Sequence, residues 1–230
     1  MKKTTLGALI VATAAFLSLA SEAQADIVFG AATNIGTEAG DVITDGILHA
    51  AVNGAEDSEA DVTLNGQLFQ SGDINAATNV STTGFTSSNA AELNPNGLGD
   101  TAEYQRFLGD IDFGGGDPAT VNIDNLTIGN AYRIQVWFLD NRDNANDDRV
   151  TTVAGVGAGA NSVALNDQFA IGDFVATSTT ESFTVSTAGS ASPNLTGFQV
   201  RDLGVAVPEP SSLALLTMGI SGLFLRRRRS

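Results

Sequence analysis

The chain has 230 residues, no cysteine, a single histidine and a formal net charge of −15. A disulfide framework is therefore impossible, and catalytic or metal centres built on several histidines or on a Cys–His pair are excluded. The sequence also contains no P-loop, G-x-S-x-G or H-E-x-x-H pattern, and a Ser-His-Asp unit would have to use His49.

The first 25 residues predict a secretory signal peptide. Lysines at positions 2 and 3 precede an uncharged apolar stretch at 6–20, and the segment ends in the small-x-small pattern Ala23-Gln24-Ala25. Small residues such as Ala23 and Ala25 fit the shallow pockets of signal peptidase. We expect export through the Sec translocon and a mature chain that begins at Asp26. The alternative is an uncleaved N-terminal anchor.

Residues 26–207 form a strongly acidic body of one domain's length. Of the 11 basic residues, two lysines and four arginines lie in the terminal segments, which leaves five. Of the 26 acidic residues, Glu22 and Glu209 lie outside the body, which leaves 24 and a net charge of −19, without any lysine. Phosphate binding needs clustered lysine and arginine, so nucleic acid is excluded as a partner. An acidic body suits solubility and divalent cations.

Short β-type segments recur along the body between Gly, Asn, Asp and Ser, and no long apolar 3.6-residue period is present. The clearest segment is 131–139, in which the alternate residues from Tyr132 to Phe138 form one apolar face. Further strands are expected at 61–65, 120–126, 162–170, 173–177, 181–187 and 196–203. The pattern predicts an all-β fold, a single antiparallel β-sandwich or jelly roll. Residues 26–100 are expected to hold loosely patterned strands and long loops, with a short helix around 89–93.

The segment Leu126-x-x-Gly129-x-x-Tyr132 leads into the clearest strand. It resembles the corner found in fibronectin type III domains and other secreted sandwiches, which implies that the Tyr132 hydroxyl bonds back to the backbone. About 70 residues of the body follow Tyr132, too many for a fibronectin module. The architecture therefore resembles larger galactose-binding-like or jelly-roll sandwiches, which carries no function with it.

An acidic segment at 140–148 follows this strand and is the first candidate for a metal site. Calcium binds carboxylate, amide and backbone oxygens, in which this segment is rich. The carboxylates expected to bind it are Asp140, Asp143, Asp147 and Asp148. Arg142 and Arg149 favour an alternative, a solvated loop ordered by internal ion pairs. The segment Asp110-x-Asp112 with the glycines at 114–116 and Asp117 is a weaker second candidate, since glycines also simply form turns.

Other side chains suggest binding or catalysis more weakly. Trp137, Tyr104 and Tyr132 could stack on sugar rings. The alternative is that these aromatic side chains are buried in the core. His49 is expected to be a partly buried structural residue. A glycosidase needs only two facing carboxyl groups, but the glutamates of the body form no recognisable pair.

The chain ends in three consecutive features: Pro208-Glu209-Pro210, an apolar run at 213–225, and four arginines. A helix over 211–225 would be about 22 Å long, shorter than a hydrocarbon core of about 30 Å. Arginines can extend such a span by reaching the membrane surface. Because basic residues flank both apolar segments, both ends are expected in the cytoplasm and the body outside. The arginines are Arg226, Arg227, Arg228 and Arg229.

This order of features resembles the PEP-CTERM sorting signal. The resemblance implies that residues 208–230 hold the exported protein transiently in the inner membrane through 213–225. It implies cleavage near Pro208-Glu209-Pro210 by an exosortase, an integral-membrane protease, in a bacterium with a Gram-negative-type envelope. Release toward the cell surface or an extracellular polymer matrix would follow.

The sequence therefore divides into a signal peptide (1–25), an exported β-sandwich (26–207) and a sorting tail (208–230). It predicts a non-catalytic surface or matrix protein whose partner is extracellular polysaccharide. Two alternatives stay open: a carbohydrate-active enzyme that uses paired carboxylates, and a calcium-dependent adhesin.

Overall fold

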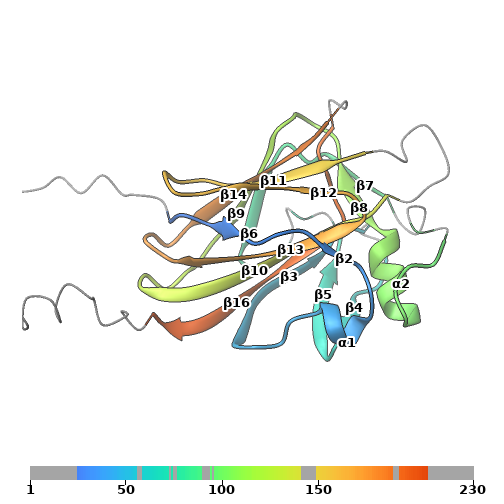
Figure 1. The fold of residues 1–230 in the computed structure, drawn as a ribbon, viewed down its shortest axis with the longest axis horizontal. Coiled ribbons are helices and arrows are strands. Elements are labelled where there is room, and N and C mark those ends of the chain that lie inside the picture. The colour runs from blue at the N-terminus through green and yellow to red at the C-terminus, as the bar shows by residue number, and fades with distance from the viewer. Residues whose placement is uncertain are drawn as a thin grey trace, which may run out of the picture.

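A computed structural model of the chain describes residues 25–55, 59–72, 74, 77–89, 94, 96–140, 149–188 and 192–206 (Figure 1). Most of these residues lie in short strands. The elements are β1 Val28–Phe29, β2 Thr33–Asn34, α1 Glu38–Asp41, β3 Ile47–Asn53, β4 Val62–Leu64, β5 Gln67–Ser71, β6 Val80–Thr83, β7 Ser87–Asn89, α2 Ala102–Gly109, β8 Ile111–Phe113, β9 Ala119–Ile123, β10 Asn130–Phe138, β11 Thr151–Gly155, β12 Ser162–Leu165, β13 Gln168–Val175, β14 Glu181–Thr187, β15 Asn194–Leu195 and β16 Gly197–Val205.

Within the described residues the strands form three sheets. The largest has eight strands in the order β1-β13-β10-β16-β3-β5-β4, with β2 beside β13. A five-stranded sheet runs β12-β11-β14-β9-β6, and a three-stranded sheet runs β15-β8-β7. Neighbouring strands are antiparallel except β3 and β5. The predicted all-β class with antiparallel sheets is confirmed. The third sheet and the two helices go beyond the single sandwich expected from the sequence.

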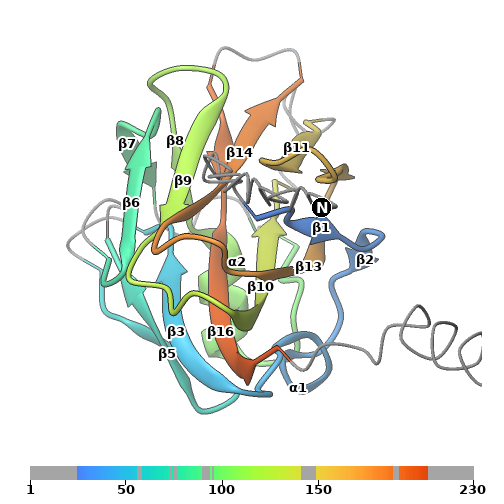
Figure 2. The same ribbon diagram turned by 90° about the vertical axis from the view of Figure 1, so that its left-hand side faces the viewer.

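The main core lies between the eight-stranded and five-stranded sheets. From the larger sheet, Ile134 and Val136 of β10 point into it, and from the smaller sheet, Val121 of β9 and Phe183 of β14 meet them, all fully buried. The Phe183 ring meets the edge of Phe198 of β16 at 5.6 Å. Figure 2 shows β6, β9, β14 and β11 curved around one side of β3, β16, β10 and β13. The predicted apolar face of the strand at 131–139 is this inner face.

The other face of the large sheet carries a second core centred on Trp137. Its ring lies 5.3 Å from Phe107 of α2 and 5.9 Å from Phe69 of β5, and its indole N–H donates to the Tyr104 hydroxyl at 3.3 Å. Helix α2 begins after Thr101, whose hydroxyl accepts the backbone N–H of Tyr104 at 3.1 Å. The helix lies beside β4 and β5 (Figure 1). A helix of eight residues was not predicted, because two turns give little periodicity.

Several predicted segments differ from the observed ones, among them the strand expected at 120–126, which is β9 at Ala119–Ile123. The strands expected at 162–170 and 173–177 are instead β12 and one continuous β13, because the chain turns at Asn166–Asp167, where Asp167 has φ +52°. Asp and Asn tolerate this left-handed conformation better than most residues. The helix expected around 89–93 falls largely on residues 90–93, outside the described part of the chain, and Asn89 ends strand β7.

The predicted tyrosine corner is confirmed. The backbone N–H of Thr127 donates to the Tyr132 hydroxyl at 2.9 Å, and Leu126 is buried beside it. The Tyr132 ring also stacks on Phe174 at 5.4 Å, so it joins the corner to the main core.

Replacing Tyr132 with phenylalanine is expected to lower the free energy of unfolding by about 1 kcal/mol, because the ring stays and one hydrogen bond is lost. Urea denaturation would show this as a lower midpoint with an unchanged slope. Thr127→Ala keeps the amide donor and is the control, with little expected change. An unchanged midpoint for Tyr132→Phe would show that the corner bond contributes nothing.

Candidate functional site

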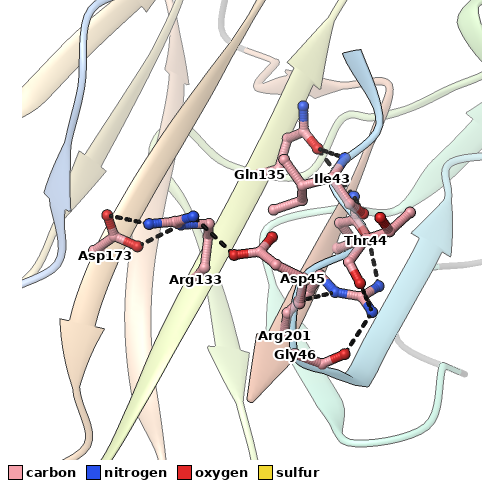
Figure 3. Close-up of polar contacts among 9 residues, drawn as sticks. Ile43, Thr44, Asp45, Gly46, Arg133, Gln135, Asp173 and Arg201 are labelled. Atoms are coloured by element: carbon pink, nitrogen blue, oxygen red, sulfur yellow. Dashed lines mark hydrogen bonds and ion pairs between the residues drawn. The ribbon is translucent and has the colours of Figure 1, made fainter. Parts of the chain in front are cut away.

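A strip of polar side chains crosses the outer face of the large sheet and is the first site to consider (Figure 3). It consists of two pairs that are directly opposite in register on β10 and β16: Arg133 with Arg201, and Gln135 with Gln199. The Gln199 amide donates to the Gln135 carbonyl oxygen at 2.9 Å, and that oxygen also accepts the backbone N–H of Ile43 at 3.2 Å. The strip therefore binds the chain's own loop, residues 43–46.

Arg201 is the buried arginine of this strip, with only 2% of its surface exposed. Its guanidinium donates to the backbone oxygens of Thr44 at 2.9 Å, Asp45 at 2.5 Å and Gly46 at 2.9 Å. Burial lowers the pKa of Arg201, and the negative charge of Asp45 opposes that shift. These acceptors satisfy the guanidinium within the fold, so Arg201 has a structural role.

Arg133 occupies the more exposed half of the strip. It donates to Asp173 of β13 at 2.7 Å and to the Asp45 carboxylate at 2.9 Å, on either side of the guanidinium (Figure 3). The hydrogen bond from Arg133 to Asp173 raises the pKa of this arginine, against the effect of partial burial. Both guanidinium groups of the strip thus have hydrogen-bond partners within the chain itself.

Replacing Arg201 with methionine is expected to lower the free energy of unfolding by about 2–3 kcal/mol, since several charge-assisted hydrogen bonds are lost. Arg133→Met is the matched control on the same face, and exposed ion pairs of this kind contribute below about 1 kcal/mol. Thermal or urea unfolding of the two variants measures the difference. Equal losses would contradict the structural role assigned to Arg201.

The three aromatic residues considered for sugar stacking are all inside the protein. Trp137 and Tyr104 are fully buried and Tyr132 is 1% exposed, so none offers a ring face to a sugar. Tyr104 donates to the Asp41 carboxylate at 2.8 Å. Burial, together with the charge of Asp41, raises the pKa of Tyr104. All three rings therefore belong to the core, which was the alternative to sugar stacking that the sequence offered.

His49 also has a structural position. Its Nε2 atom lies 2.8 Å from the backbone oxygen of Asp124, and its ring meets the edge of Tyr132 at 5.6 Å. Neither contact brings a serine or threonine hydroxyl to the imidazole. The expectation of a partly buried structural histidine agrees with this placement.

Of the four carboxylates expected to bind calcium, only Asp140 lies in the described part of the chain. Its side chain is buried, and it pairs with Arg149 at 3.6 Å, one of the two arginines that favoured an ion-paired loop. Asp143, Asp147 and Asp148 lie outside the described residues. Among the residues that the structure describes, no group of three or more His, Cys, Asp or Glu is placed to hold a metal ion.

The second acidic candidate forms a buried polar cluster at the end of α2. Asp110 and Asp112 are each 1% exposed, and Asp110 accepts the side-chain amide of Asn53 at 2.7 Å. The Asn53 carbonyl oxygen is itself buried and has no hydrogen-bond partner among the residues that the structure describes. Asp117, at the far side of the glycine turn, instead accepts the backbone N–H of Thr187 at 3.3 Å. The Asp112 carboxylate accepts the backbone N–H of Ile74 at 2.9 Å, so the direct contact in this cluster is between Asp110 and Asn53.

The first and last described residues lie at the same end of the large sheet. In the sheet register, Val28 of β1 pairs with Asp173 of β13, and Val175 of β13 pairs with Ala131 of β10. The residue before Ala131, Asn130, pairs with Val205 near the end of β16. Three strand spacings separate β1 from β16, which is roughly 14 Å. Figure 1 shows β1 and the end of β16 toward the same side. The predicted signal peptide and tail therefore join the body at neighbouring points.

Comparison with protein families identifies the segment after β16. Residues 206–229 match the model of the PEP-CTERM protein-sorting motif. The tail is a PEP-CTERM sorting motif. The match covers about a tenth of the chain and leaves the body without a family. No curated protein and no solved structure matches the chain.

The PEP-CTERM motif implies an exported protein that is processed by a membrane-embedded exosortase on its way to the cell surface. The resemblance seen in Pro208-Glu209-Pro210, the apolar run and Arg226–229 is thus confirmed. These residues, like Ala23, lie outside the described part of the structure, and the roles expected of them stay predictions. No helix of the described part is long and apolar enough to cross a membrane.

The burial of several polar residues of the body was not predicted from the sequence. Gln135, Gln199 and Arg201 lie in predicted strands, but nothing in the sequence indicated that they are buried. Glu181 begins a predicted strand and is fully buried. The sequence gives no signal for these burials, because the covering segments come from distant parts of the chain.

Proposed function

We propose that this protein is a non-catalytic component of the cell surface or extracellular matrix of a bacterium with a Gram-negative-type envelope. It is exported through the Sec translocon, held in the inner membrane by residues 213–225, and released by exosortase. The observation that carries the proposal is the sorting motif at residues 206–229. The geometry of the body supports it, since both terminal segments join one end of the large sheet.

Removal of the host's exosortase tests this route. We expect the protein to accumulate in the inner membrane in a form that still contains residues 213–230, and to disappear from the medium. Fractionation followed by mass measurement checks both. Unchanged release without exosortase would contradict the proposed route.

Extracellular polysaccharide is the partner that we propose from this destination. Since the aromatic rings considered for sugar stacking are buried, recognition would use exposed polar side chains of an acidic surface. Co-sedimentation of the mature protein with exopolysaccharide from the native host tests this. Binding that is saturable supports the partner, and its absence rejects it.

The catalytic alternative needs two carboxyl groups open to a sugar. Asp110, Asp112 and Glu181 are at most 1% exposed and are therefore not open to a sugar. Hydrolysis of host exopolysaccharide by the pure protein, abolished by a carboxylate substitution, would favour the enzyme instead.

A calcium-dependent adhesin is the second candidate, and one observation favours it. The amide oxygen of Asn53 has no hydrogen-bond partner among the described residues, the same amide group contacts the buried carboxylate of Asp110, and calcium binds such oxygens. A melting temperature that rises in millimolar calcium, and no longer does so in Asp110→Asn, would support this candidate. Equal melting temperatures in calcium and in chelator would reject it.

A further inference from the structure

Glu181, the first residue of β14, is a fully buried carboxylate at the N-terminal end of the body. Its Oε1 atom accepts the backbone N–H and the hydroxyl of Thr177, both at 2.9 Å, and the backbone N–H of Ser178 at 2.9 Å. Its Oε2 atom accepts the backbone N–H of Ala25 at 2.8 Å. The carboxylate thus bridges a turn of the chain and the segment that precedes β1.

No arginine in the described part of the chain contacts this carboxylate. Each one is engaged elsewhere, in ion pairs or with backbone oxygens. Burying a charged group is costly unless it is paired as well as hydrogen-bonded. The described arginines are Arg106, Arg133, Arg149 and Arg201.

The Oε2 atom points at the position where the signal peptide is expected to end. Ala25 is the last residue of the predicted signal peptide, yet it is only 3% exposed and belongs to the main core. Ile27 and Phe29 are buried in the same core, and β1 pairs with β13. Ala25 is therefore held by Glu181, and the residues that follow it are anchored in the main core.

Cleavage changes the chemistry at this point. Addition of water across the Ala25–Asp26 peptide bond leaves a carboxylate on Ala25 and an amine on Asp26, which takes up a proton to become an α-ammonium. Ala25, with its amide donor, then departs. Since one residue spans about 3.5 Å, the new ammonium is created within roughly 6 Å of the Glu181 carboxylate. The Asp26 side chain itself lies against Gly157 and Gly159.

We propose that Glu181 is the binding site for the α-ammonium of Asp26, which signal peptide cleavage creates. The inference rests on the proposed export route. The mature N-terminus replaces the neutral Ala25 donor with a cation and gives the buried carboxylate its counter-charge. Removal of the signal peptide thereby stabilises the exported body, and the precursor lacks this ion pair.

The protein is well suited to a direct test, because its only lysines are Lys2 and Lys3 of the signal peptide. In the mature protein the α-amine is therefore the sole primary amine. Reductive ¹³C-methylation of protein recovered from the native host labels that amine alone, and NMR titration of the label gives its pKa. We expect a pKa at least about one unit above the ordinary 7.7–8.0, because a nearby carboxylate favours the charged form.

Glu181→Gln is expected to return this pKa to the ordinary range. Glu103→Gln is the matched control, since Glu103 is exposed and pairs with Arg106 at 3.4 Å, and it should leave the raised pKa unchanged. An ordinary pKa in the wild-type protein, or an equal pKa in Glu181→Gln, would overturn the inference.

A second measurement needs no substitution and covers the case in which Glu181→Gln does not fold. Acetylation of the single amine of wild-type protein removes its charge, and we expect a lower melting temperature near neutral pH. An unchanged melting temperature would also overturn the inference.

N-terminal sequencing of the same sample separates this inference from the export proposal. A start at Asp26 with an ordinary pKa, or a start at another residue, overturns the Glu181 site and leaves export intact. An uncut precursor as the only form overturns both.

Discussion

Replacing Pro208, Glu209 and Pro210 with alanine is expected to stop release of the protein and leave it in the inner membrane. The apolar run at 213–225 and the arginines after it are unchanged in this variant, so membrane insertion continues. The variant loses the segment at which exosortase is expected to cut. Cell fractionation should find nearly all of the variant in the inner membrane, and its mass should include the tail.

The matched control replaces Ser211 and Ser212 with alanine. It changes the same part of the tail by a similar amount and keeps Pro208-Glu209-Pro210, so normal release is expected. Normal release of the triple-alanine variant would show that this segment is not the signal that exosortase reads.

Replacing Trp137 with alanine is expected to give the largest loss of stability in the body, about 3–5 kcal/mol. Trp137 is fully buried and its ring contacts Phe69, Phe107 and Phe169 at centroid distances of 5.3–6.2 Å. Its removal leaves a cavity between α2 and the large sheet, and it removes a donor from the Tyr104 hydroxyl. Urea denaturation measures the loss as a lower midpoint.

Two comparisons calibrate the Trp137→Ala result. Trp137→Phe keeps most of the ring and should lose less. Ile128→Ala removes an exposed side chain, 61% accessible, and should change stability by no more than about 0.5 kcal/mol. If Trp137→Ala were as stable as Ile128→Ala, the second core would not hold α2 to the sheet.

The elements with regular patterns were predictable from the sequence. The strand at 181–187 matches β14 in full, and the strand at 131–139 differs from β10 by one residue at each end. In β14 buried and partly exposed residues alternate throughout, which is the signal that a period of two detects. In β10 they alternate only over the first half, and the apolar face from Tyr132 to Phe138 provides the signal. The corner at Tyr132 could be predicted because the turn and the tyrosine that bonds to it lie within seven consecutive residues.

The hairpin between β4 and β5 could also have been predicted from the sequence. Asn65-Gly66 joins β4 to β5, and both residues have positive φ, +46° and +75°. Asn-Gly between two short apolar segments is a strong indication of such a turn. Only the first strand of this pair was predicted, because Gln67–Ser71 has little apolar alternation.

Strand β3 could not be predicted, for a physical reason. Its last four residues, Ala50 to Asn53, are all buried, because one core covers each face of the sheet. A strand covered on both faces loses the alternation by which strands are recognised. The contact between Glu181 and Ala25 was equally inaccessible, since 156 residues separate the two.

The most direct test of the account is the intact mass of the protein recovered from the cell surface and medium of its native host. We predict a mass that begins at Asp26 and ends near Pro208, with or without added sugar. That result means that signal peptidase and exosortase have both acted and that the protein works outside the cell. A mass that still contains residues 213–230 would contradict the account and place the protein at the inner membrane as a permanently anchored component.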